Sequence, residues 1–198
     1  KEQSRQQVLE KYGPGPHRVE FQVKAAGKKK PGKFLVELAP LSVMPHSVEV
    51  FLDMVTSGLW DNTVFYHHSQ HSHVVAAAPV NYGTFESKQH HFEALGYNGV
   101  SFPEYSETFA HEEYTIGFSG RGPNFYINTI NNSNHHGPGG QQQHHVLAED
   151  ADPCFAKVVW GKNVIQEMMP KHSKKANPVT WEDFDLTQIV KVRLVTNA

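Results

Sequence analysis

The sequence predicts a mostly β domain whose sheet closes into a barrel, and three observations support this prediction. Two short apolar runs, residues 114–119 and 124–130, are separated by a bend in which two glycines and a proline supply the backbone angles of a tight turn. A third run, residues 154–159, is rich in β-branched side chains. We expect residues 186–195 to pair with the first strand of the chain, which would close the sheet and remove its free edges.

The first part of the chain alternates between helical and strand patterns. Residues 1–12 have apolar side chains at near-helical spacing, and the Gly-Pro-Gly-Pro segment at 13–16 ends that helix. Polar and apolar residues alternate over 18–23, and a second strand is expected from Phe34 to Leu38, so the sequence predicts a hairpin across a lysine-rich turn. We therefore divide the chain into a helical and linker extension, residues 1–16, and a main domain, residues 17–198.

Two helices are expected within the main domain. Val48, Phe51, Leu52 and Val55 fall at i, i+3, i+4 and i+7, which predicts an amphipathic helix that begins near Pro45. A second, shorter helix is predicted at residues 163–169 because Pro170 stops it.

Length and composition fit one domain with a sizeable core. The chain has 198 residues, a formal net charge of −2 and 19% charged residues. No basic stripe is present, so we expect no binding to nucleic acid. No apolar run approaches the roughly 18 residues of a membrane helix, so we expect no membrane insertion by this segment.

The single cysteine and one glycosylation motif bear on the cellular context. Cys154 has no partner for an internal disulfide, and we expect it to pack as a small apolar side chain. Asn131-Asn132-Ser133 is an acceptor triplet for an N-linked glycan, which keeps the lumen of the secretory pathway open as a location. The chain begins at Lys1 without a signal peptide, and we expect it to be part of a larger protein.

The order of these segments, and several stretches within them, resemble the cyclophilins. The second half of a cyclophilin is similar to residues 122–127, Gly-Pro-Asn-Phe-Tyr-Ile, followed by a glycine-rich loop and then Asp-Pro-Cys-Phe-Ala-Lys-Val-Val at 152–159. The first half is similar to the helix after Pro45 and the run from Thr63 to Tyr66. The resemblance implies a closed eight-stranded antiparallel barrel capped by two helices. It also implies peptidyl-prolyl cis–trans isomerase activity on a proline-containing peptide or partner protein, with no cofactor.

Isomerisation of an X-Pro bond needs help because the uncatalysed barrier is about 18–20 kcal/mol. In cyclophilins an arginine donates a hydrogen bond to the prolyl nitrogen, which requires a strong, permanently charged donor. At the matching position this chain has His67, whose imidazole is mostly neutral at pH 7. Ala76 replaces the family's glutamine, and Asp152 stands at the place of a histidine.

The resemblance assigns the rest of the substrate groove to residues on both walls. Tyr126 would form the floor of a proline pocket by offering a flat apolar face. Arg121 could act as a substitute donor from the opposite wall, or could point to solvent from its turn. The groove positions implied by the resemblance are Phe65, Val74, Ala76, Ser119, Gly120, Asn124, Tyr126 and Asp152.

Three functional interpretations follow. We favour a protein-binding or structural module with weak or absent isomerase activity, because one charged hydrogen bond contributes about 1.5–3 kcal/mol and three partners are changed. The alternative is a divergent active isomerase that uses Arg121 or protonated His67. A third interpretation is a metal-binding module, since the chain has 14 histidines, four of them between residues 67 and 73. These histidines lack a recognised metal signature, so we assign no metal ligands.

Overall fold

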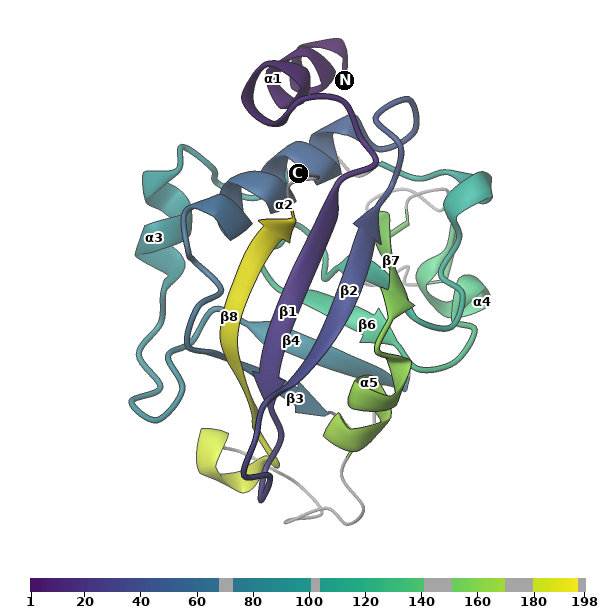
Figure 1. The fold of residues 1–198 in the computed structure, drawn as a ribbon. Helices are drawn as coiled ribbons and strands as arrows, with labels where there is room; N and C mark the ends of the chain where they lie inside the picture. Colours follow the sequence, from purple (N-terminus) through teal and green to yellow (C-terminus); the bar gives the residue numbers. More distant parts are fainter. Residues whose placement is uncertain (68–72, 101–103, 141–150, 170–179, 196–198) are drawn as a thin grey trace.

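The computed structural model describes residues 1–67, 73–100, 104–140, 151–169 and 180–195, and it contains a closed antiparallel barrel (Figure 1). Around the barrel the strand order is β1-β2-β7-β5-β6-β4-β3-β8. This confirms the predicted eight-stranded barrel. The strands are β1 (Arg18–Lys24), β2 (Gly32–Leu38), β3 (Thr63–His67), β4 (Val74–Ala78), β5 (Thr115–Phe118), β6 (Phe125–Asn128), β7 (Cys154–Trp160) and β8 (Thr187–Val195).

The structure has the helix expected in the amino-terminal extension and the two helices expected in the main domain. Further short helices lie in the loops. The long helix α2 lies across one end of the barrel, and α5 lies at the other end (Figure 1). No helix in the described part of the chain is long and apolar enough to cross a bilayer. The helices are α1 (Glu2–Tyr12), α2 (Pro45–Thr56), α3 (Gln89–Ala94), α4 (Ser133–His136) and α5 (Lys162–Met168), with short 3-10 turns η1 (Glu107–Phe109) and η2 (Trp181–Asp183).

The register of the strands is set by an aromatic interior. Phe65 of β3, Phe125 of β6 and Phe118 of β5 lie in one row across the sheet and are fully buried. The Phe125 ring packs edge-on against Trp60, with 4.7 Å between ring centroids. Because neighbouring residues on a strand face opposite sides, Tyr126 must lie on the outer surface of the barrel. A shift of one residue would expose Phe125, so the core determines which face carries Tyr126.

Strand β8 closes the barrel by pairing with β1 on one side and β3 on the other. Its register against β1 shifts between Gln22 and Val23, which face Lys191 and Ile189. Val190 is therefore the additional residue of a bulge. The polar–apolar alternation of the sequence also breaks at residues 188–190, which is consistent with a bulge.

The amino-terminal helix α1 packs against α2. Val8 is fully buried, and the Ser4 hydroxyl lies 3.2 Å from Nδ1 of His46. At the other end of α1, Tyr12 and Lys11 bind the Asp53 carboxylate, which also accepts a hydrogen bond from Tyr97. Burial works against this carboxylate, but the hydrogen bonds outweigh it and the pKa of Asp53 lies below its usual value.

A buried carboxylate holds the start of α2. Oε2 of Glu104 accepts hydrogen bonds from the backbone N–H of Ser47 at 2.7 Å and from its hydroxyl at 2.8 Å, while Oε1 accepts one from the N–H of His46. These N–H groups belong to the first turn of α2, where no helical carbonyl can pair with them. Glu104 is 1% exposed, so its charge is compensated by these donors and by the helix dipole.

We predict that Glu104→Gln destabilises the fold by about 1–3 kcal/mol, because the amide of glutamine brings an N–H towards N–H donors and removes the charge. Urea denaturation followed by tryptophan fluorescence measures this change. Glu107→Gln, at an exposed position in η1, is the matched control and should leave the free energy of unfolding nearly unchanged. Equal stability of the two variants would contradict this role of Glu104.

Candidate functional site

The outer surface of the barrel carries a row of residues at the predicted groove. Strand pairing places Tyr66 opposite Ala76, Ala76 opposite Tyr126, and Tyr126 opposite Gly117. Residues directly opposite each other on paired strands share a face. The small side chains of Ala76 and Gly117 therefore flank Tyr126 on both sides, and a β-carbon at Gly117 would lie only 2.9 Å from the Tyr126 hydroxyl oxygen.

The hydroxyl of Tyr126 is tied to a buried carboxylate. It donates a hydrogen bond of 2.9 Å to Oδ2 of Asp152, while Oδ1 of Asp152 lies 3.4 Å from the backbone N–H of Gly120. Tyr126 is 3% exposed and Asp152 1% exposed. Burial, followed by the negative charge of Asp152, raises the pKa of Tyr126 well above its usual value. The phenol therefore stays protonated at neutral pH and stabilises the Asp152 charge by donating this hydrogen bond.

His111 is a member of this cluster that the sequence did not reveal. Its Nε2 donates to the backbone carbonyl of Asp152 at 2.9 Å, which leaves Nδ1 as an acceptor facing the Tyr126 hydroxyl and the amide of Asn128. Burial lowers the pKa of His111 to about 4. Its ring also stacks on Tyr126 at 6.0 Å between centroids. His111 is 41 positions from Asp152, and no local motif marks it.

A second histidine, His136 at the end of α4, packs against the Tyr126 ring beside His111. The centroids of the Tyr126 and His136 rings are 4.5 Å apart and their planes differ by 31°. The centroids of the His111 and His136 rings are 5.5 Å apart. Nδ1 of His136 lies 3.3 Å from Oδ2 of Asp152, and the residue is 5% exposed. Asn132 attaches this segment to the barrel, because its N–H donates to the His111 carbonyl and its amide donates to Asn128.

The structure brings only some of the predicted groove residues together. Tyr126, Asp152 and Gly120 lie together, with Ala76 beside Tyr126 on the adjacent strand. Phe65 lies inside the barrel instead, where it packs 5.8 Å from Phe125 and supports the floor from behind. The remaining positions are Val74, paired with Asn128 and 7% exposed, and Ser119 and Asn124, which bond to each other across the β5–β6 turn.

The two candidate hydrogen-bond donors, His67 and Arg121, do not take part in the hydrogen bonds of the Tyr126–Asp152 cluster. His67 is opposite Val75, a core residue, so it shares the inner face of the sheet and not the face of Ala76 and Tyr126. Both of its ring nitrogens are shielded from solvent. Arg121 is exposed in the β5–β6 turn, and its Nε lies 3.4 Å from the carbonyl oxygen of Val100.

Metal-ligating side chains do not gather in the described part of the chain. No group of three or more His, Cys, Asp or Glu side chains there has a geometry that could hold a metal ion. His68 and His71, from the group between residues 67 and 73, lie outside the described residues, as does the adjacent pair His144 and His145. Cys154 is buried, as expected, and its thiol faces the carbonyl of Ala110; burial raises the pKa of the thiol to about 12.

We predict that His111 makes the fold sensitive to acid. Its pKa lies near 4 in the folded protein and near 6.5 in the unfolded chain, so between these values the unfolded chain binds the additional proton. The free energy of unfolding is therefore unaffected by His111 protonation above about pH 6.5. It decreases as the pH falls to about 4, by roughly 3 kcal/mol in total. Urea titrations across this range should show the loss.

His111→Gln keeps an N–H donor but cannot take up a proton. This variant should flatten the pH dependence between 6.5 and 4, while His90→Gln, at a side chain 99% exposed, should retain it. An unchanged slope in His111→Gln would show that other groups cause the acid sensitivity.

Comparisons with known proteins agree with this architecture. Residues 20–190 match the family model for cyclophilin type peptidyl-prolyl cis-trans isomerases. No curated protein matches the sequence. A cyclophilin-type isomerase from Cryptosporidium parvum is similar in structure, with a TM-score of 0.58 and 14% identity over 92% of this chain and 99% of the other.

Two further solved structures show the same fold. The Cryptosporidium parvum protein in the presence of the dipeptide Ala-Pro gives a TM-score of 0.57 at 15% identity, covering 91% of this chain and 99% of the other. The Mimivirus cyclophilin gives 0.54 at 12% identity, covering 92% and 91%. The family match spans most of the chain, and the structure has the closed eight-stranded barrel that the sequence predicted. The chain therefore belongs to the cyclophilin type peptidyl-prolyl cis-trans isomerase family.

Proposed function

We propose that this domain is a cyclophilin-like module that binds a peptide or protein partner and has weak or no prolyl isomerase activity. The observation that supports the proposal best is the covered floor of the groove. Tyr126 is only 3% exposed, and the neighbouring rings of His136 and His111 pack against it, with centroids 4.5 and 6.0 Å from its own. A prolyl ring that stacked on Tyr126 would have to displace His136.

Displacing His136 would carry a cost in free energy. His136 and the Tyr126 hydroxyl both contact Oδ2 of Asp152, so moving the histidine weakens the surroundings of a buried carboxylate. An imperfectly satisfied buried charge costs about 1–3 kcal/mol or more. This cost reduces the affinity for proline by the same amount, which is about one to two powers of ten.

The electrostatic requirement of the reaction supports the same proposal. Isomerisation is accelerated by a donor whose hydrogen bond to the prolyl nitrogen is stronger in the twisted transition state than in the planar ground state. Among the candidate donors, His67 shares its face with core residues and Arg121 approaches the Val100 carbonyl. The hydrogen-bonding contacts of the Tyr126 hydroxyl within the described residues are with Asp152 and His111, and not with either candidate donor. The domain retains the barrel of an isomerase while its donor positions face elsewhere.

We predict that the domain accelerates isomerisation of a succinyl-Ala-Xaa-Pro-Phe anilide by less than about one power of ten at micromolar concentration. A protease-free absorbance assay measures the rate. Arg121→Ala and His67→Ala should leave the small rate unchanged. A large rate that Arg121→Ala or His67→Ala abolishes would establish the divergent active enzyme instead.

We also predict that His136→Ala exposes the face of Tyr126 and increases affinity for the dipeptide Ala-Pro by about tenfold or more. Titration with the dipeptide, followed by amide chemical shifts of Ala76, Tyr126 and Gly117, measures the change. His135→Ala, on the exposed side of α4, is the matched control and should bind like the unmodified protein. Tight binding of Ala-Pro by the unmodified protein would contradict a closed groove.

A further inference from the structure

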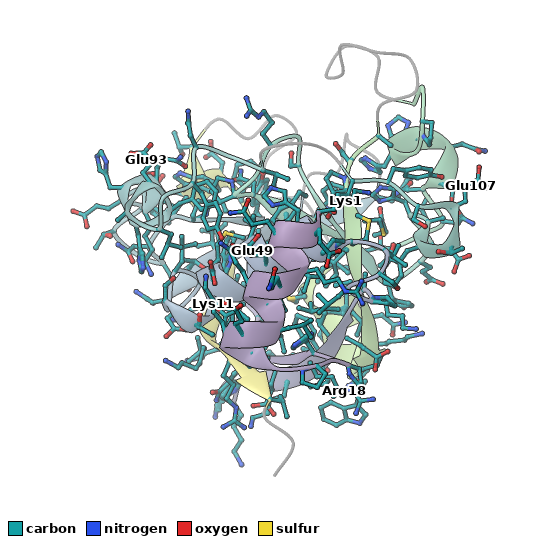
Figure 2. All side chains as sticks on the ribbon, turned by 90° about the horizontal axis from the view of Figure 1, so that it is seen from above. Lys1, Lys11, Arg18, Glu49, Glu93 and Glu107 are labelled. Atoms are coloured by element: carbon teal, nitrogen blue, oxygen red, sulfur yellow. The ribbon has the colours of Figure 1, made fainter. Side chains whose placement is uncertain are left out.

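A second concave surface lies between the amino-terminal helix and the barrel, away from Tyr126. We call it the α1 groove: α1 forms one wall with Arg5 and Leu9, the link from β2 to α2 forms the floor with Leu41 and Val43, and Phe109 of η1 lies opposite. The groove encloses about 700 Å³, a volume within the range of ligand sites in proteins. Figure 2 shows this end of the molecule, with α1 between Lys1 and Lys11 and Glu107 of η1 to one side.

The α1 groove depends on a segment that precedes the family match. Residues 1–19 lie outside the matched range of 20–190, yet they supply the α1 wall and the Pro14–His17 end of the groove. The helix is held in place by the buried Val8 and by the bonds of Lys11 and Tyr12 to Asp53. The wall is therefore anchored and preorganised for a ligand.

The apolar side chains of the groove remain available for contact. Leu9 is 41% exposed although its neighbour Val8 is fully buried, so α1 directs one apolar residue to the core and another to the groove. Leu41, Val43 and Phe109 are partly buried and pack against the core from the floor and the far wall. A ligand that covers them removes apolar surface from water.

The charges that line the groove are mostly positive. Two basic side chains, Arg5 and Lys157, line the groove, and each is about half exposed. The carboxylate of Glu37 also lines it, but two hydrogen bonds from Arg18 hold that group, at 3.0 and 3.1 Å, and Lys157 is 4.0 Å away. Arg5 has Glu2 as an ion-pair partner at 3.9 Å, where the Glu2 side chain is 82% exposed. On a chain of net charge −2, this local excess favours an anionic ligand.

We propose that the α1 groove binds a short peptide segment in which apolar side chains flank a carboxylate. The aliphatic side chains would contact Leu9, Leu41 and Val43, and the carboxylate would lie between Arg5 and Lys157. The volume of about 700 Å³ suits a segment of a few residues. This surface does not share a residue with the Tyr126 cluster, so a partner can dock here while the proline groove stays closed.

Two matched peptides test the proposal: acetyl-Leu-Glu-Leu-amide and acetyl-Leu-Gln-Leu-amide, which differ only in the carboxylate. Each is titrated into the ¹⁵N-labelled domain, and the amide shifts of Leu41, Val43 and Thr108 report binding. The glutamate peptide should bind several-fold more tightly than the glutamine peptide, and rising salt should remove the difference because the ion pairs are half exposed.

Variants of the groove assign the effect to its side chains. Arg5→Gln and Lys157→Gln should each weaken the glutamate peptide about two- to fivefold and leave the glutamine peptide unchanged. Leu9→Ser should weaken both peptides. Lys24→Gln, an exposed lysine outside the groove, should change neither. Shifts outside the groove, or equal affinities for the two peptides in the unmodified protein, would overturn the proposal.

Discussion

The alternation of side chains on strand β6 is the constraint on which the structure depends. Phe125 fills the barrel and packs against Trp60, Phe51 and Phe65, so the next residue must face outward. That residue is Tyr126, and its position next to Ala76 and Gly117 follows from the pairing of β4, β5 and β6. One packing arrangement therefore determines both the stability of the core and the location of the groove. Tyr126 keeps its outward position as long as Phe125 stays inside the barrel.

The surroundings of the Tyr126 ring are determined by the polar contacts of a buried carboxylate. Asp152 is an anion in a nearly dry site, and its surroundings supply the Tyr126 hydroxyl, the Gly120 N–H and His136. Each of these contacts lowers the cost of burying the charge. Their combined effect is to draw α4 onto Tyr126. The burial of the Tyr126 ring thus accompanies the satisfaction of one buried carboxylate, and our proposal of a closed groove rests on this arrangement.

The sequence predicted the barrel well because barrel formation depends on patterns that repeat along each strand. The β5–β6 hairpin and the helix after Pro45 both followed from local periodicity and turn residues. The resemblance to cyclophilins led to Tyr126 and Asp152, which the structure brings together. It did not lead to His111, or to the position of His136 over the ring, because these contacts join segments that are far apart in sequence. Phe65 was assigned to the groove and lies in the core, since its neighbour Tyr66 takes the outer face.

The most direct test of the closed groove is a crystal structure of the domain grown with the dipeptide Ala-Pro at high concentration. Our account predicts that His136 stays over the Tyr126 ring, that the Tyr126 hydroxyl keeps its bond to Asp152, and that no prolyl ring lies on Tyr126. A dipeptide whose proline stacks on Tyr126, with His136 moved aside and a guanidinium at the prolyl nitrogen, would contradict it.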